Sequence, residues 1–241
     1  MRLLVVEHDH VSPLGHVAER FEQRGFEISR HTVVDQLSFA NPGVDSAFPD
    51  FDQFDAVVLM GAPWSTYDHD LIGSWVLPEM EQVARADAKG VPVLGICFGG
   101  QLLASVLGGR VLSSDRAEIG WSDIETDDAS VVPEGPWFQW HYDRWVLPPG
   151  ASEIARNAAA SQAFVYRRNL AVQFHPELSS AMLDGWLSNG GASKAAEVGV
   201  DPERLVAETA LRAAEAGRRA QLLVDGFLDH VATRPLSESV A

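Results

Sequence analysis

The sequence is poor in basic residues and in cysteine. Its 241 residues include 18 Lys and Arg against 34 Asp and Glu, which gives a formal net charge of −16 at pH 7. Such a surface repels nucleic-acid phosphates and anionic membranes unless it carries a local basic patch. The densest basic stretch, GRRAQ, holds only two arginines inside a helix-like segment. We therefore expect neither nucleic acid nor a membrane among the partners. The single cysteine, Cys97, excludes an internal disulfide.

Long apolar runs and metal-ligand clusters are also lacking. The N-terminal stretch MRLLVVEHDH is apolar for only four residues, which predicts neither a signal peptide nor an anchor. No window approaches the roughly 20 apolar residues that span a bilayer, so we expect a cytoplasmic protein. The EHDH segment at 7–10 has two histidines but no closing pair of ligands, and we expect an ordinary loop there. The sequence predicts no metal site and no cofactor.

Short apolar runs alternate with helix-like segments along most of the chain. The runs LLVV, FDAVVLMG, VPVLGI and LAVQFH are typical of buried parallel strands. Amphipathic segments lie between them, and this alternation favours an α/β fold with a doubly wound, mostly parallel sheet. Residues 110–168 differ, because they contain short strand-like pieces and many turn residues. We expect a small antiparallel insertion there.

The C-terminal part predicts a long amphipathic helix over 201–232, which begins at Asp201 and Pro202. We therefore divide the chain into a domain over 1–190 and a helical extension over 191–241. The apolar positions of the extension predict that it packs on the same domain.

The sequence GICFG places Cys97 between a predicted strand and a predicted helix. This G-x-C-x-G pattern is the cysteine form of the nucleophile elbow, a sharp turn that strains the backbone of the nucleophile. The helix N-terminus favours a thiolate there. The backbone N–H of Phe98 would point toward an oxyanion formed by attack of the sulfur. The alternative for a lone cysteine is a buried structural residue.

The sequence QFHPE supplies a base for this thiol. His175 follows a predicted strand, so it should lie at the same edge of the sheet as Cys97. Pro176 favours extended backbone, in which residues two apart face the same way. Glu177 is therefore placed to accept a hydrogen bond from one nitrogen of His175 and fix its tautomer. A third segment, LMGAPWSTYD, also follows a strand, and its small residues let backbone N–H groups approach a ligand.

These three segments, in this order, resemble the class I glutamine amidotransferases. The family's elbow stands here as GICFGGQ (95–101), its oxyanion loop as GAP (61–63) and its HPE as 175–177. MGAPWSTYD, AEIGW and WHYD are most similar to free-standing relatives of the GMP synthase glutaminase domain. The resemblance covers residues 1 to about 187 and implies a flavodoxin-like fold.

The resemblance also implies roles for individual residues. Cys97, His175 and Glu177 would form the catalytic triad, and the N–H groups of Ala62 and Phe98 would form the oxyanion hole. Ala62 stands where the commoner family sequence GGP has its middle glycine, so a glycine-only conformation there would weaken that hole. The residues that would bind the substrate are Gly61, Gln101, His141, Tyr142 and Asp143. For Glu118 we expect an exposed acid, and for Trp121 a packed aromatic at the sheet edge. The alternative is that both belong to a cleft wall or to a loop that faces a partner.

The expected function is hydrolysis of the γ-amide of glutamine, or of a γ-glutamyl compound, through a glutamyl thioester. Alternatives are a γ-glutamyl peptidase, an α/β-hydrolase with a cysteine nucleophile, and a catalytically weak binding protein on the same scaffold. No G-x-x-x-x-G-K-[ST] loop occurs to activate an acceptor. We therefore expect either a synthetase partner on another chain or a stand-alone hydrolase.

Overall fold

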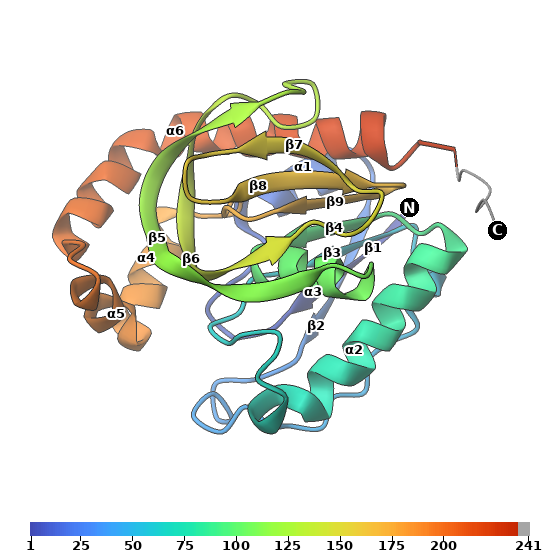
Figure 1. Ribbon diagram of the computed structural model, residues 1–241, viewed down its shortest axis with the longest axis horizontal. Helices are drawn as coiled ribbons and strands as arrows, with labels where there is room; N and C mark the ends of the chain where they lie inside the picture. The colour runs from blue at the N-terminus through green and yellow to red at the C-terminus, as the bar shows by residue number, and fades with distance from the viewer. Residues whose placement is uncertain (236–241) are drawn as a thin grey trace.

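A sheet of nine strands organises the part of the chain, residues 1–235, that the computed structural model describes. The strand order is β2-β1-β3-β4-β9-β8-β7-β5-β6 (Figure 1). The parallel strands are β1 (Arg2–Glu7), β2 (Glu27–Thr32), β3 (Ala56–Leu59), β4 (Val93–Ile96) and β9 (Asn169–Val172). The antiparallel strands are β5 (Arg110–Thr126), β6 (Gly135–Val146), β7 (Ser152–Arg156) and β8 (Ser161–Tyr166).

Helices cover both faces of the parallel strands, as Figure 1 shows. Helices α1 (Gly15–Gln23) and α6 (Pro202–Gly226) pack on one face, and α2 (His69–Lys89) and α3 (Phe98–Val106) pack on the other. Strand β1 shows the reason. Leu3 and Val5 join the core under α1 and α6, whereas Leu4 joins the core under α2 and α3, because alternate side chains of a strand point to opposite faces. The predicted doubly wound α/β fold is confirmed.

The middle of the chain is antiparallel, as predicted, but its pieces are not short. Strand β5 has 17 residues and β6 has 12. Together they form a curved two-stranded ribbon at the end of the sheet opposite β2 (Figure 1). Between Ser113 and Glu118 the register shifts within β5, and the strand continues. A β-bulge bends a strand without ending it.

The C-terminal helices continue directly from the sheet. After β9 the chain forms α4 (Ser180–Trp186), the helical turn η2 (Leu187–Gly191) and α5 (Ala192–Glu197). Helix α6 follows, and then the helical turn η3 (Phe227–Val231). The Asp201 carboxylate caps α6 by accepting from the N–H of Glu203 at 3.0 Å. The remaining short element is the 3₁₀ turn η1 (Phe51–Gln53). Residues 236–241 of the predicted extension lie outside the described residues.

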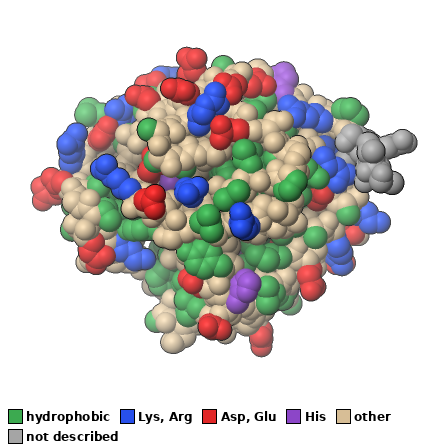
Figure 2. Space-filling model, in the orientation of Figure 1, with side chains coloured by type: hydrophobic (Ala, Val, Ile, Leu, Met, Phe, Trp, Pro, Cys, Tyr) green, Lys and Arg blue, Asp and Glu red, His purple; other side chains and the backbone are tan. Residues whose placement is uncertain are grey.

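Two ion pairs tie α6 to α1. Arg20 contacts Asp225 at 2.7 Å and Arg24 contacts the same carboxylate at 2.5 Å. Apolar side chains of α6, including Leu223, are fully buried in the core under α1. The division at residue 190 falls inside η2 and stays a prediction. Of the helices in residues 1–235, none is long and apolar enough to cross a membrane. On the face in Figure 2, basic side chains are interspersed with acidic ones.

Candidate active site

The turn between β4 and α3 holds Cys97 in a strained conformation. Its backbone has φ 51° and ψ −107°, which side-chain-bearing residues rarely adopt. Two flanking glycines make the turn possible. A Cβ at Gly95 would lie 2.6 Å from the carbonyl oxygen of Gly99, and one at Gly99 would lie 2.2 Å from that of Leu59. The geometry is that of a nucleophile elbow.

The surrounding strands fix this turn from both sides. The N–H of Cys97 donates to the carbonyl of Val172 on β9 at 2.8 Å, and that of Gly99 donates to Met60, just after β3, at 3.0 Å. The Cys97 side chain is 5% exposed. Its Sγ lies 3.7 Å from the carbonyl oxygen of Trp140 and 3.8 Å from Nε2 of Gln173. Cys97 directly precedes α3, so its thiol lies at the N-terminus of that helix, where the helix dipole favours negative charge.

His175 and Glu177 form a buried pair next to this turn. Nδ1 of His175 lies 2.7 Å from Oε1 of Glu177, and the two side chains are 5% and 0% exposed. The N–H of His175 donates to the carbonyl of Phe138 on β6 at 2.8 Å, which fixes the backbone after β9. Nε2 is buried and has no hydrogen-bond partner within residues 1–235. The pair is thus oriented, with one ring nitrogen left for other chemistry.

Electrostatics favour the charged imidazolium form of His175. Burial lowers the pKa of His175, but the charges of Glu177 and Cys97 outweigh the burial and raise that pKa well above its ordinary value. An imidazolium beside Cys97 in turn stabilises a negatively charged sulfur. The edge of the Trp186 indole covers the ring, with a centroid distance of 4.9 Å, and contributes to keeping this pair away from water.

The loop after β3 brings a third segment to the same place. A Cβ at Gly61 would lie 3.1 Å from Cε1 of His175 and 3.9 Å from Cβ of Cys97, so the three segments approach closely and a side chain at position 61 would crowd the imidazole. Within residues 1–235, the N–H groups of Ala62 and Phe98 donate to no other protein group. Two free donors beside a nucleophile are what an oxyanion hole requires.

The alanine in the GAP loop does not strain this arrangement. Among the described residues other than glycine, positive φ occurs only at Cys97 and Arg167. Ala62 therefore adopts backbone angles that any residue tolerates. In this loop the tighter position is Gly61, where a Cβ would crowd the His175 ring.

A cavity of about 310 Å³ opens at Cys97. It brings together every residue predicted to bind substrate, since its lining includes Gly61, Gln101, His141, Tyr142 and Asp143. Several of these side chains are already engaged. Nε2 of Gln101 donates to the carbonyl of Asp143 at 3.2 Å, and the Asp143 carboxylate accepts from Ser65 Oγ at 2.5 Å and from the Tyr67 hydroxyl at 2.8 Å. These contacts shape the cavity wall.

The expectation of an exposed acid at Glu118 is wrong. Its carboxylate is partly buried and accepts from Nε2 of His141 at 3.0 Å, from Asn157 at 2.6 Å and from Gln162 at 2.9 Å. Burial raises the pKa of Glu118, but these partners, His141 first, outweigh it and lower the pKa. Glu118 of β5 lies directly opposite His141 of β6 in the antiparallel pair, which brings the two side chains together. Trp121 packs at the edge as expected and donates to Thr209 of α6 at 3.0 Å.

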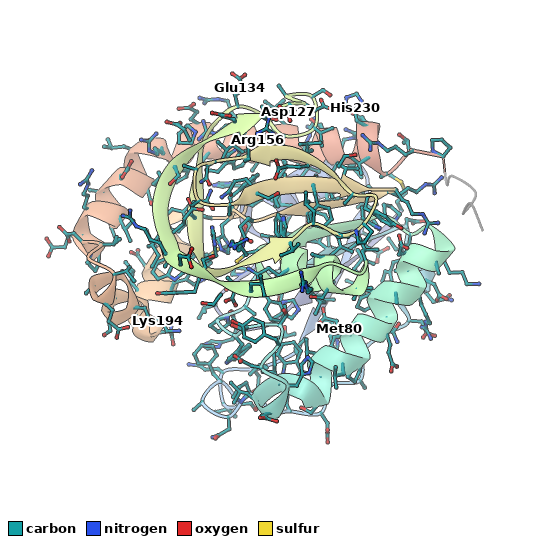
Figure 3. The ribbon with its side chains drawn as sticks, viewed as in Figure 1. Met80, Asp127, Glu134, Arg156, Lys194 and His230 are labelled. Carbon is teal, nitrogen blue, oxygen red and sulfur yellow. The ribbon has the colours of Figure 1, made fainter. Side chains whose placement is uncertain are left out.

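Sequence reasoning missed part of the cavity wall. Trp186, Asn189, Gly191 and Lys194 line the cavity from the segment that begins at α4, and Figure 3 labels Lys194 where it projects from α5. No motif marks these residues, because they reach the cavity only through the packing of α4 and α5. From the N-terminal part, Asp9, Ser12 and Phe39 also line it.

Comparison with known proteins gives consistent matches. The family described as glutamine amidotransferase class-I has a sequence model that matches residues 15–189. The chain is 32% identical over 194 residues to a glutamine-hydrolyzing GMP synthase of Aeropyrum pernix, which covers 74% of this chain and 34% of that protein. For the corresponding protein of Thermus thermophilus the identity is 33% over 189 residues, with coverage of 72% and 35%. The chain thus spans about a third of these two curated relatives.

Solved structures resemble the whole chain. A glutamine amido transferase from Methylobacillus flagellatus has a TM-score of 0.79 and 25% identity, with coverage of 98% of this chain and 96% of the other. A glutamine amidotransferase from Thermotoga maritima has a TM-score of 0.79 and 24% identity, with coverage of 97% and 98%. The second likeness concerns the fold alone.

Proposed function

This chain belongs to the class-I glutamine amidotransferase family, and we propose that it hydrolyses the γ-amide of glutamine or of another γ-glutamyl compound. The observation that carries the proposal is the strained turn at Cys97 beside the buried His175–Glu177 pair, with Nε2 of His175 unbonded within residues 1–235. Thiol, base and orienting acid are the parts that nucleophilic amide hydrolysis needs.

In the first step the Cys97 sulfur attacks the amide carbonyl carbon, and the C=O electron pair moves onto oxygen. The N–H groups of Ala62 and Phe98 would donate to that oxyanion, since both lack a protein acceptor within residues 1–235. The imidazolium of His175 then gives its Nε2 proton to the leaving nitrogen. The C–N bond breaks, ammonia or an amine departs, and a glutamyl thioester stays on Cys97.

In the second step water attacks the thioester. Neutral His175 takes a proton from this water, the C–S bond breaks, and glutamate leaves. The Glu177 carboxylate holds Nδ1–H at 2.7 Å throughout, which keeps the ring in one tautomer and stabilises each imidazolium stage. Both steps use the same oxyanion donors.

For substrate binding we propose the wall formed by Gly61, Gln101, His141, Tyr142 and Asp143. The Asp143 carboxylate suits the α-ammonium group of a glutamyl substrate, because it is the acid of this set and lines the cavity. Gln101 and His141 both hydrogen-bond the carbonyl of Asp143, at 3.2 Å and 2.9 Å, and so hold that residue in place.

The size of the cavity favours a second candidate, a γ-glutamyl peptidase. A volume of about 310 Å³ reaches the range of roughly 300–1,000 Å³ that holds drug-sized ligands. Aromatic walls at Trp64, Trp140 and Trp186 leave room for a group beyond the scissile nitrogen. A dipeptide with a γ-glutamyl bond uses that room, whereas free glutamine does not.

A synthetase partner and a cytoplasmic location are further proposals. The two relatives named above are glutamine-hydrolyzing GMP synthases of about three times the aligned length, which supports a synthetase site as the acceptor of ammonia made here. Co-purification of the chain from its own cells tests the partner, and cell fractionation tests the location.

The direct test is turnover by the purified chain. We expect glutamate to be released from glutamine or from a γ-glutamyl dipeptide, and the Cys97→Ser variant to release none while keeping the circular dichroism spectrum of the wild type. Good cleavage of dipeptides with poor use of glutamine selects the peptidase. Slow use of glutamine that rises on addition of cell extract selects the partnered glutaminase. Equal turnover by Cys97→Ser would remove the proposed nucleophile.

A further inference from the structure

A second buried histidine–glutamate pair lies behind the oxyanion loop. His8, just after β1, and Glu79, on α2, are both 0% exposed. Nε2 of His8 lies 3.0 Å and 3.1 Å from the two carboxylate oxygens of Glu79. Nδ1 of His8 lies 3.3 Å from the carbonyl oxygen of Gly61. The segment that the sequence predicted to be an ordinary loop is therefore part of the site's support.

The partners of His8 define its protonation. A carboxylate and a peptide carbonyl only accept hydrogen bonds, so each ring nitrogen of His8 must carry a proton to bond its partner. Both contacts are made only by the imidazolium form. Burial lowers the pKa of His8, but Glu79 outweighs it and raises that pKa, in agreement with the contacts.

The peptide between Gly61 and Ala62 links this pair to the chemistry. The described peptide bonds are all trans, so the C=O of Gly61 and the N–H of Ala62 point in opposite directions from one plane. His8 holds the C=O end. The N–H end is then aimed away from His8, and both Gly61 and Ala62 line the cavity at Cys97.

His8 also contacts the other half of the oxyanion hole. Its ring packs edge-on against the ring of Phe98, with centroids 4.8 Å apart, and stacks on Trp75 at 5.6 Å. The N–H of Phe98 is the second proposed donor. A single side chain thus contacts Phe98 and the carbonyl of the peptide that carries the Ala62 N–H.

We propose that His8, held by Glu79, is a positioning residue of the oxyanion hole: its imidazolium fixes the Gly61–Ala62 peptide and polarises the Ala62 N–H. The inference rests on the proposed amide hydrolysis. A buried ion pair costs desolvation free energy that packed apolar side chains would not. A fixed cation behind the donor peptide stabilises negative charge on the oxyanion without contacting the substrate.

The test compares two amides that replace different ring nitrogens. In His8→Asn the side-chain NH₂ stands at the place of Nδ1 and can still donate to Gly61. In His8→Gln it stands at the place of Nε2 and can donate only to Glu79. His31→Gln is the control, because His31 is a half-buried histidine on the edge strand β2, bonded to Ser46.

We expect kcat to fall about tenfold in His8→Gln, a fraction of the 10²–10³ that a direct oxyanion donor contributes. KM should not change, because the oxyanion exists only after attack. His8→Asn should keep kcat to within about threefold of wild type, since one neutral hydrogen bond replaces a charged one. Equal losses in both His8 variants, or a change in KM alone, would overturn the positioning role.

Alkylation of Cys97 by iodoacetamide distinguishes a specific effect on the oxyanion hole from a general disturbance of the active site. This reaction uses the same sulfur but displaces iodide at a saturated carbon, so no oxyanion forms. Its rate should be the same in wild type, His8→Gln, His8→Asn and His31→Gln. Slower alkylation in His8→Gln, in step with kcat, would show that the whole site has moved, and the inference would fail.

Nuclear magnetic resonance of the Ala62 amide keeps the inference testable even without turnover. If the wild type hydrolyses no γ-glutamyl amide, the proposed function fails by that result alone. The inference then predicts that the Ala62 amide proton moves upfield in His8→Gln and much less in His8→Asn, because the hydrogen bond that polarises the peptide is lost only in the first. Identical Ala62 shifts in all three proteins would overturn it.

Discussion

Of the histidine–glutamate pairs around the cavity at Cys97, His175–Glu177 and His8–Glu79 have the most deeply buried carboxylates, and they differ in what their ring nitrogens contact. In His175–Glu177 one nitrogen is held at 2.7 Å and the other has no hydrogen-bond partner within residues 1–235. In His8–Glu79 both nitrogens lie against oxygen acceptors. A ring with an open nitrogen can exchange a proton with a reacting group, whereas a ring bonded on both sides holds its neighbours in place.

The same residue types therefore serve two purposes within one site. We assign proton transfer to His175 and positioning to His8. The residue types of a buried pair therefore do not define its role. What defines the role is whether the second ring nitrogen of the histidine has a hydrogen-bond partner. Substituting the matching residue in each pair tests whether His175 transfers a proton and His8 acts by positioning.

The largest difference is expected between His175→Gln and His8→Gln. Glutamine at 175 keeps a polar side chain but cannot take up a proton, so kcat should fall about ten-thousandfold, as when a triad member is disabled. His8→Gln should lower kcat about tenfold, because the oxyanion donors themselves remain. Steady-state kcat with the best γ-glutamyl amide measures both. Losses of similar size would break the division of roles.

The next largest effect is expected for Glu177→Gln. The neutral amide cannot stabilise the imidazolium, so kcat should fall about a thousandfold while KM changes little. In the wild type, Glu177 and Cys97 raise the pKa of His175 well above its ordinary value against the effect of burial. Without the carboxylate, burial should win and that pKa should fall. An NMR titration of the imidazole measures the change, and an unaltered titration would remove Glu177 from the mechanism.

Glu79→Gln is expected to act about as strongly as His8→Gln. Its amide oxygen can still accept from Nε2, but the charge that keeps His8 protonated is gone. Nδ1 then loses its proton and no longer donates to Gly61, which should lower kcat about tenfold with KM unchanged. The Ala62 amide proton should move upfield in the NMR spectrum. A variant with wild-type kcat would show that the charge of Glu79 is irrelevant.

Ala62→Gly should have a small effect on activity. Since Ala62 has no positive φ, glycine offers no conformation that the native peptide needs. We expect kcat within about threefold of wild type, and a loss of about 0.4–1 kcal/mol in unfolding free energy because glycine has more freedom in the unfolded chain. A large gain in kcat would show that alanine strains the oxyanion hole.

Leu223→Ala should leave kcat unchanged and lower stability. Leu223 lies on α6 in the extension and is fully buried under α1. Truncating a buried leucine costs about 2–5 kcal/mol of unfolding free energy. Urea unfolding followed by circular dichroism measures this value. A loss well below that range would show that α6 packs loosely on the domain, contrary to the predicted division into a domain and a docked extension.

The sequence carries enough to predict the fold and the proposed catalytic residues. The carboxyl ends of parallel strands lie at one edge of a sheet. Because Gly61, Cys97 and His175 each come just after a predicted strand, the sequence predicts that they lie together at that edge. His175 and Glu177 are two residues apart, and extended backbone puts both side chains on one side. Local pattern suffices for these features.

The supporting residues could not be predicted in the same way. His8 and Glu79 are separated by 71 residues, and their contact depends on how α2 packs against β1. Acidic side chains are mostly exposed, yet Glu118 lies opposite His141 across β5 and β6 and accepts a hydrogen bond from it. Trp186 and Lys194 reach the cavity only through the packing of α4 and α5. Such contacts follow from tertiary packing, which no local pattern encodes.

The central claim is that Cys97 attacks a γ-glutamyl carbonyl in this cavity. Incubation with a chloroketone analogue of glutamine, followed by peptide mass mapping, tests it most directly. We expect one label per chain, on Cys97. It should form more slowly when glutamine or a γ-glutamyl dipeptide is present, and it should be absent in Cys97→Ser. If iodoacetamide alkylates Cys97 but the glutamine-shaped reagent does not, or if substrates give no protection, the thiol is accessible and the cavity does not bind a γ-glutamyl group, which contradicts the account.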